Sequence, residues 1–170
     1  MARRRRAIKR QIIPDSVFGN QKVARFINML MLDGKKSIAE TILYTSINDM
    51  YAKLKSSNKL ENTEGKAEKE VKVDLFYKVL DNVGPEVEVK SKRIGGATYQ
   101  IPTSVNLARK EQIAMKWLIK ASRNRKEKGF ALRLTNEMID AYDMKGSSIK
   151  MREDMHKMAE ANQAFAHYGW

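Results

Sequence analysis

Residues 86–103 read EVEVKSKRIGGATYQIPT, and over this stretch the hydrophobic pattern changes from a helical period to a period of two. Apolar and polar residues alternate on both sides of Gly95-Gly96, which predicts a β-hairpin. A three-residue loop, Ile94-Gly95-Gly96, would keep each face of the ribbon consistent and place Val89 opposite Ile101. We therefore predict two antiparallel strands in that register.

Helical patterns flank the hairpin on both sides. Apolar residues follow a 3.6-residue period over about 20–32, 37–55, 72–83, 106–122, 130–145 and 147–166. Asn20 suits an N-cap, and Ser37-Ile38-Ala39-Glu40 has the form of a capping box. A single hairpin cannot form an independent sheet. The predicted fold is therefore mainly α, a six-helix bundle with one protruding two-stranded antiparallel β-hairpin and a basic N-terminal arm.

Domain organisation follows from where the periodicity stops. Residues 1–19 are predicted to form a basic arm, which either anchors on the body through apolar residues such as Ile12 and Phe18 or remains a solvated tail. Residues 20–170 are predicted to form a single helical domain. Within this domain 56–70 reads as a longer surface loop. The apolar stripes also place Ile38, Leu107 and Met158 in the core.

Composition narrows the classes of partner. The 170 residues include 33 Lys and Arg against 20 Asp and Glu, a formal net charge of +13. Such an excess indicates a polyanionic partner, with RNA, DNA and an anionic membrane as candidates. The densest apolar run, Met29-Leu30-Met31-Leu32, is much shorter than the roughly 20 residues of a membrane-spanning helix. We expect a soluble intracellular protein without a membrane partner.

Catalytic motifs are sparse. With no cysteine, thiolate metal sites and cysteine nucleophiles are excluded, and no His–carboxylate spacing indicates a metal. His156 and His167 are eleven positions apart, and each reads as an ordinary hydrogen-bonding residue. Gly34-Lys35-Lys36-Ser37 resembles the end of a phosphate-binding loop, but Met29 stands where that loop needs glycine. We predict no enzyme activity, no cofactor and no metal.

Basic residues gather on arms, loops and helix ends instead. The clusters are Arg3, Arg4, Arg5, Arg6, Lys9 and Arg10; Lys35 and Lys36; Lys90, Lys92 and Arg93; Arg109, Lys110 and Lys116; and Lys120, Arg123, Arg125, Lys126 and Lys128. Any one cluster can be a solubilising surface, but together they fit a protein that follows folded RNA. Tyr99 reads equally well as a packed residue or as a base-stacking one, whereas Trp117 falls on an apolar stripe.

Several stretches resemble one known family. They are RRRRAIKRQIIPDSVFGN (3–20), DGKKSIAE (33–40), VEVKSKRIGGATYQIP (87–102), AMKWLIKASRNR (114–125) and KMREDMHKMAEANQAFAHYGW (150–170). Together and in order they resemble the bacterial-type small-subunit ribosomal protein seven family. Two departures are the longer segment at 56–70 and Gly169, which stands where the family commonly has an arginine.

The resemblance implies a structural constituent of the small ribosomal subunit in the cytoplasm, bacterial rather than organellar. It implies binding to the 3′ major domain of the small-subunit ribosomal RNA (rRNA) and nucleation of head assembly. It also implies exit-site transfer RNA (tRNA), messenger RNA (mRNA), small-subunit protein eleven and other head proteins as neighbours. The basic clusters would then contact rRNA. Lys150 and Arg152 would join them, and the hairpin residues that would contact rRNA or tRNA are Lys90, Lys92, Arg93, Gly95, Gly96 and Tyr99.

Two other classes remain open on the residues alone. A free-standing nucleic-acid regulator would reside outside ribosomes and bind DNA comparably. An enzyme acting on RNA would lose turnover when one particular carboxylate or histidine is changed.

Overall fold

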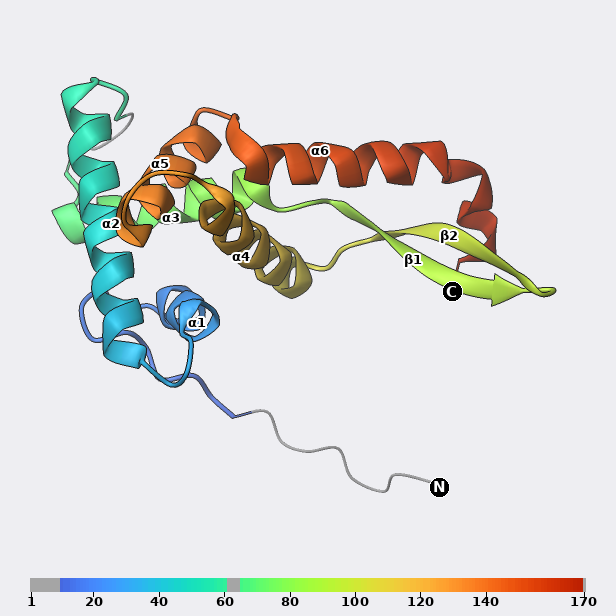
Figure 1. The fold of residues 1–170 in the computed structure, drawn as a ribbon, viewed down its shortest axis with the longest axis horizontal. Helices are drawn as coiled ribbons and strands as arrows, with labels where there is room; N and C mark the ends of the chain where they lie inside the picture. Colours follow the sequence, from blue (N-terminus) through green and yellow to red (C-terminus); the bar gives the residue numbers. More distant parts are fainter. Residues whose placement is uncertain (1–9, 61–64, 170) are drawn as a thin grey trace.

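Six α-helices, a two-stranded hairpin and a short 3₁₀ helix follow one another along the part of the chain that the structure describes. The computed structural model describes residues 10–60 and 65–169. The elements are α1 (Gln21–Leu30), α2 (Lys36–Ser56), α3 (Glu68–Val83), β1 (Val87–Ile94), β2 (Ala97–Ser104), α4 (Leu107–Asn124), α5 (Phe130–Tyr142), α6 (Gly146–Ala161) and η1 (Gln163–Tyr168). The mainly helical fold with one antiparallel hairpin is confirmed. Figure 1 shows the hairpin extending away from the helices, with α6 running along the same direction.

The core lies around α5, which packs against α2, α3, α4 and α6. Leu134 and Met138 of α5 are fully buried, and they pack with the apolar faces of the surrounding helices. Phe26 of α1 meets Phe76 of α3 edge to face, with ring centroids 5.3 Å apart. Burying large apolar side chains is the main stabilising contribution to a fold of this size.

The observed start of α1 agrees with the prediction, whereas those of α2 and α3 differ from it. The Asn20 side chain caps α1 and accepts from the Lys22 amide at 2.8 Å, as predicted. The predicted capping box is wrong, because α2 begins at Lys36 and Ser37 already lies in its first turn. The Ser37 carbonyl therefore accepts the Thr41 hydroxyl at 3.0 Å, as a residue inside a helix can. α3 begins at Glu68, earlier than the expected position near Lys72.

Three residues that the apolar stripes placed in the core are exposed. Ile38 is 56%, Leu107 67% and Met158 48% accessible to solvent. Ile38 and Leu107 lie in the first turns of their helices, and Met158 lies near the end of α6. The apolar spacing in the sequence continues to the ends of each helix. The neighbouring helices do not extend as far, so apolar residues at the ends stay exposed.

The predicted register of the hairpin is wrong by one residue. Lys90 pairs with Ile101 and Lys92 with Tyr99, so the loop contains only Gly95 and Gly96. Both glycines have positive φ, +56° and +90°. Positive φ at both central residues is what the two-residue turn matching the twist of a hairpin requires, and glycine adopts it without steric cost. The two glycines therefore form the whole turn.

The C-terminal segment braces the hairpin. The Tyr99 ring lies 5.1 Å from that of Phe165 and 5.5 Å from that of Tyr168, both in η1. Lys92 Nζ donates to the Tyr168 carbonyl at 3.1 Å. Nearer the body, His156 Nε2 of α6 accepts the amide of Glu86 at 3.1 Å, so this histidine is an ordinary hydrogen-bonding residue. The ribbon projects, but α6 and η1 support it along its length (Figure 1).

A turn before α1 is anchored on α2. The buried Asp15 carboxylate accepts the amides of Val17 and Phe18, at 3.1 and 2.8 Å, and the Tyr44 hydroxyl. Phe18 packs edge-on against the Tyr44 ring. Burial, reinforced by the hydrogen bond to Asp15, raises the pKa of Tyr44 to about 12. This part of the predicted arm is therefore attached to the body. Arg3, Arg4, Arg5, Arg6 and Lys9 lie outside the described residues.

Candidate nucleic-acid interface

An exposed basic surface runs along α4 and into the loop that follows it. Lys116, Lys120 and Arg123 are spaced by four and three residues, so they share one face of the helix over about 10 Å. Lys126 and Lys128 continue the surface in the loop, and all five side chains are exposed. In the part of the chain that the structure describes, no carboxylate lies within ion-pair distance of any of them. We call these five residues the α4 stripe.

Arg125 lies in the same loop but points into the protein. Its guanidinium contacts three carboxylates, with Nη1 2.8 Å from Glu137 and 2.6 Å from Asp140, and Nη2 2.8 Å from Glu127. The hydrogen bond from Arg125 is the largest cause that lowers the pKa of Glu127 to about 2. The charge of Arg125 is thus neutralised within the chain, unlike that of its neighbours in the α4 stripe.

Glu137 connects that arginine to the start of α6. Its carboxylate is fully buried and accepts the amide of Ser148 at 2.9 Å and its hydroxyl at 2.7 Å. It therefore satisfies a free amide in the first turn of α6, as a capping side chain does. Gly146, with φ +92°, leaves only 3.0 Å between a Cβ placed there and Glu137 Oε1. A side chain at position 146 would disturb this contact.

The cations at the base of the hairpin are partly paired. Glu88 of β1 contacts Lys90 Nζ at 3.1 Å and Arg109 Nε at 3.3 Å. Burial raises the pKa of Glu88, but the hydrogen bonds from Lys90 and Arg109 outweigh it and hold the value below its ordinary range. The same carboxylate thus holds the base of β1 against the start of α4. Arg93, near the tip, is exposed.

The other predicted contact residues are dispersed. Arg152 Nη1 donates to the carbonyl of Asn82, which fixes α6 on the end of α3, whereas Lys150 is exposed. The side chain of Lys110 lies against Gly84. Arg10 is exposed. The structure thus places the predicted residues on several surfaces rather than one.

Lys35 and Arg123, from separate sequence clusters, line one cavity between α2 and α4. Lys35 and Lys36 also form exposed ion pairs with Asp33 at 4.0 Å and Glu40 at 3.6 Å, and such pairs contribute little stability. Both lysines therefore remain available to an anion.

Two residues beside the α4 stripe were missed by the sequence analysis. Arg133 donates through Nη1 to the carbonyl of Arg123 at 3.2 Å, and its guanidinium carbon lies 5.4 Å from the Phe130 ring centroid. Its buried Nε has no hydrogen-bond partner among the described residues. The sequence feature that could have identified this pair is the three-residue spacing of Phe130 and Arg133, which places both on one helix face.

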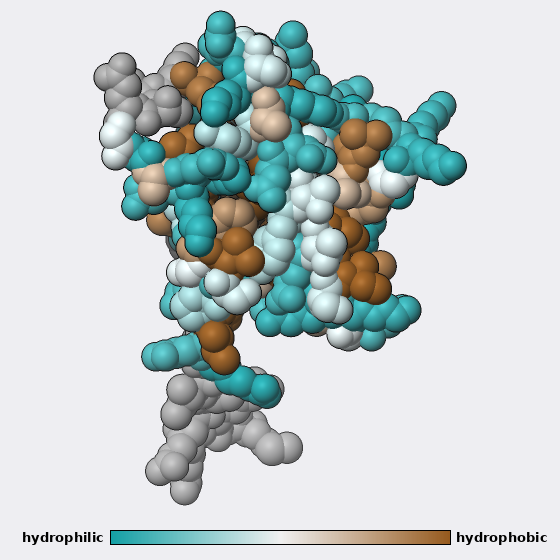
Figure 2. Space-filling model, turned by 90° about the vertical axis from the view of Figure 1, so that its left-hand side faces the viewer, coloured by the Kyte–Doolittle hydropathy of each residue, from teal (hydrophilic) through white to brown (hydrophobic). Residues whose placement is uncertain are grey.

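Neither a metal-ligating cluster nor a membrane-spanning helix occurs in the described ranges, 10–60 and 65–169. No group of three metal-ligating side chains occurs there. No helix within these ranges is long and apolar enough to cross a bilayer. Figure 2 shows the side of the molecule on which α2 lies, where hydrophobic side chains form separate patches among hydrophilic ones.

The fold is a helical body with a projecting hairpin that α6 and η1 support. Its surface carries the α4 stripe, whose cations have no carboxylate partners among the described residues. These features define a class, the basic helical proteins suited to binding a polyanion. The family model for ribosomal protein S7p/S5e matches residues 2–163. The chain is 51% identical to the small ribosomal subunit protein uS7 of Colwellia psychrerythraea, 50% to that of Psychromonas ingrahamii and 46% to that of Rhodobacter capsulatus, each over the whole of both chains. The chain belongs to the ribosomal protein S7p/S5e family. It is a structural ribosomal component, not an enzyme.

Proposed function

We propose that this protein binds the 3′ major domain of small-subunit rRNA and nucleates assembly of the head of the subunit. The observation that carries the proposal is the α4 stripe, five exposed cations on one helix and its loop without carboxylate partners in the described chain. A surface of like charges held at fixed spacing repels itself unless anions lie between its members. Family membership and bacterial relatives named as small-subunit proteins support the same reading.

The binding mode is charge neutralisation by a rigid body. Each phosphate contact releases counterions, so six to ten contacts make affinity fall roughly 10³- to 10⁵-fold between low and physiological salt. Side chains cannot reach base edges in the deep, narrow groove of duplex RNA. Cations that face a duplex therefore recognise the shape of its phosphate backbone. The stripe, Lys35-Lys36 and the hairpin then hold separate RNA segments in one arrangement.

The hairpin serves a second RNA contact. Lys90, Lys92, Arg93 and the Gly95-Gly96 turn approach the exit-site tRNA near the mRNA exit path, and Tyr99 supports them by packing on η1. α6, with Lys150 and Arg152, faces small-subunit protein eleven. The ribosome is that of a bacterial cytoplasm, in keeping with the bacterial relatives.

Sedimentation tests the proposal. Tagged protein expressed in a bacterium should co-migrate with small subunits in a sucrose gradient after a high-salt wash. Lys120→Glu/Lys126→Glu should reduce incorporation, whereas Lys53→Glu, an exposed α2 position outside the stripe, should incorporate as the parent does. Residence of the parent protein only in the light fractions would contradict a ribosomal role, and comparable binding to DNA would favour a free-standing regulator.

A further inference from the structure

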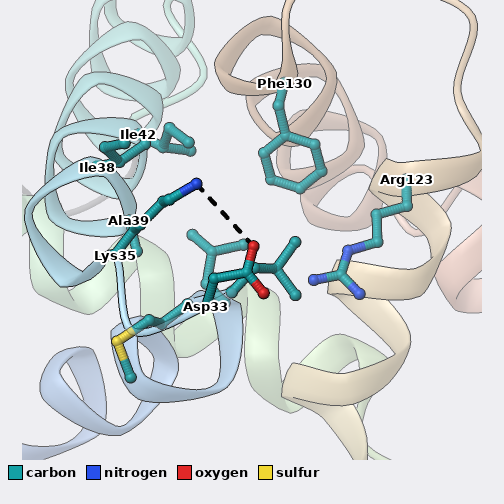
Figure 3. Close-up of a pocket in the computed structure, with 10 residues that line it drawn as sticks. Asp33, Lys35, Ile38, Ala39, Ile42, Arg123 and Phe130 are labelled. Carbon is teal, nitrogen blue, oxygen red and sulfur yellow. Dashed lines mark ion pairs between the residues drawn. The ribbon is translucent and has the colours of Figure 1, made fainter.

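An apolar cavity of about 480 Å³ opens between the α1–α2 turn, the first turns of α2, the end of α4 and the start of α5. Figure 3 shows Ile38 and Ile42 on the α2 side, with the Phe130 ring projecting from α5 toward the same space. Leu32 and Ile38 line it while being 61% and 56% exposed. Such apolar walls open to solvent indicate a binding surface rather than an unfilled core.

Two cations, Lys35 and Arg123, and one carboxylate, Asp33, lie among the residues that line these apolar walls, so the net charge there is positive. Lys35 lies on one side and Arg123 extends from α4 on the other, as Figure 3 shows. Arg123 has no carboxylate within ion-pair distance among the residues described, whereas Lys35 pairs only with the exposed Asp33. The first turn of α2 also lies at this site, and in the described chain no side chain hydrogen-bonds to cap it. Its free amides favour an anion.

We propose that this cavity receives one unpaired nucleotide of the ribosomal RNA. The base would lie between the Phe130 ring and the α2 isoleucines, and the phosphate would meet Arg123 and Lys35. An unstacked base offers a flat apolar face that aromatic side chains bind in any sequence context. The inference rests on the proposed rRNA binding and adds a site that reads single-stranded structure.

Charge complementarity selects RNA over a protein segment as the occupant. Arg123 belongs both to the α4 stripe and to the cavity, so RNA that follows the stripe reaches the opening directly. The volume lies within the range of about 300–1,000 Å³ typical of small-ligand sites. Arg133 adds a further positive charge next to Phe130. A hydrophobic peptide would gain nothing from these cations.

Two cavity variants and a matched control test the proposal against a transcript of the small-subunit rRNA 3′ major domain. Ile38→Ser removes an exposed wall residue, and Phe130→Leu replaces the aromatic ring with an aliphatic side chain. Leu132→Ser is the control, because Leu132 is 41% exposed on the same helix but does not line the cavity. Both cavity variants should weaken binding about five- to hundred-fold, and the control should bind as the parent does. Thermal midpoints confirm that each variant folds.

Chemical probing of the RNA supplies the decisive readout. The parent protein should protect one unpaired nucleotide, and ultraviolet cross-linking should join that nucleotide to the peptide containing Phe130. Ile38→Ser should lose this protection while keeping protections along duplex backbones. Unchanged affinity and protection in Ile38→Ser would overturn the cavity site and leave rRNA binding intact. A cross-link from Phe130 to a ribosomal protein in assembled subunits would also overturn it. Failure of the parent to bind the transcript would reject the proposed function itself.

Discussion

The ring of Tyr99, on β2, lies 5.1 Å from the ring of Phe165, on η1, so the end of the chain packs on the hairpin. We predict that Phe165→Ala loosens the ribbon without unfolding the body. An aromatic pair contributes about 0.5–1.5 kcal/mol, so amide exchange in β2 should accelerate roughly two- to tenfold. Hydrogen-exchange mass spectrometry measures this. Gln163→Ala, at an exposed position of the same 3₁₀ helix, should leave β2 unchanged. Equal exchange in the two variants would show that η1 does not brace the hairpin.

Arg123 and Arg125 differ in what they contact, and matched variants should separate their roles. Arg125→Met removes the cation beside the buried Glu137, and we expect a loss of about 2–4 kcal/mol in the free energy of unfolding. Arg123→Met, at an exposed position, should cost under about 0.5 kcal/mol but weaken RNA binding. Urea denaturation and RNA titration measure the two effects. A stable Arg125→Met protein with weak RNA binding would show that Arg125 contacts RNA and does not have the structural role proposed for it.

Tyr44 gives the turn before α1 a dependence on alkaline pH. Its pKa is raised to about 12, chiefly by burial and then by the hydrogen bond to Asp15. The fold therefore favours the protonated hydroxyl. The resulting stabilisation is complete below the unfolded value near 10 and is lost as pH rises through about 12.

Unfolding free energies of the parent and Tyr44→Phe should therefore differ by a constant amount up to about pH 10. Above that pH the difference should shrink. Denaturant titrations at a series of pH values measure it. A difference that already declines between pH 7 and 9 would contradict the raised pKa.

The α4 stripe predicts a specific salt dependence. Each phosphate contact contributes a slope of about −0.7 to −0.9 to the logarithm of affinity against the logarithm of salt concentration. Lys120→Ala/Lys126→Ala should therefore make the slope shallower by about 1.4 to 1.8, while thermal stability stays unchanged because both side chains are exposed. Lys53→Ala serves as the control. Lower affinity at an unchanged slope would mean that these lysines do not contact phosphates.

The fold was largely predictable because its signals are local. Asn20 caps α1 as expected, and the apolar stripe of α3, including Phe76 and Val79, is buried. The register of the hairpin was not predictable from alternation alone. Shifting β1 by one residue against β2 leaves the alternation along each strand unchanged. The observed register depends instead on Gly95 and Gly96 both adopting positive φ and forming a two-residue turn.

The site was less predictable, because charge on a sequence does not reveal partners in space. Arg125 and Lys126 are neighbours in a basic run, yet one is neutralised by carboxylates from α5 and its own loop and the other is exposed. The placement of Lys35 and Arg123 around one cavity depends on how α2 and α4 each pack against α5. Only tertiary packing assigns such roles.

The contact between Glu137 and Ser148 has a mechanical consequence. α6 runs from Gly146 to Ala161 and so extends about 20 Å beyond Ser148, with η1 at its far end. A tilt of roughly 5° at the Ser148 end would move the far end by about 2 Å, taking the tip of the ribbon with it. The Glu137 carboxylate therefore helps to fix the angle of α6, and through α6 the position of η1 and of the hairpin tip that packs on it.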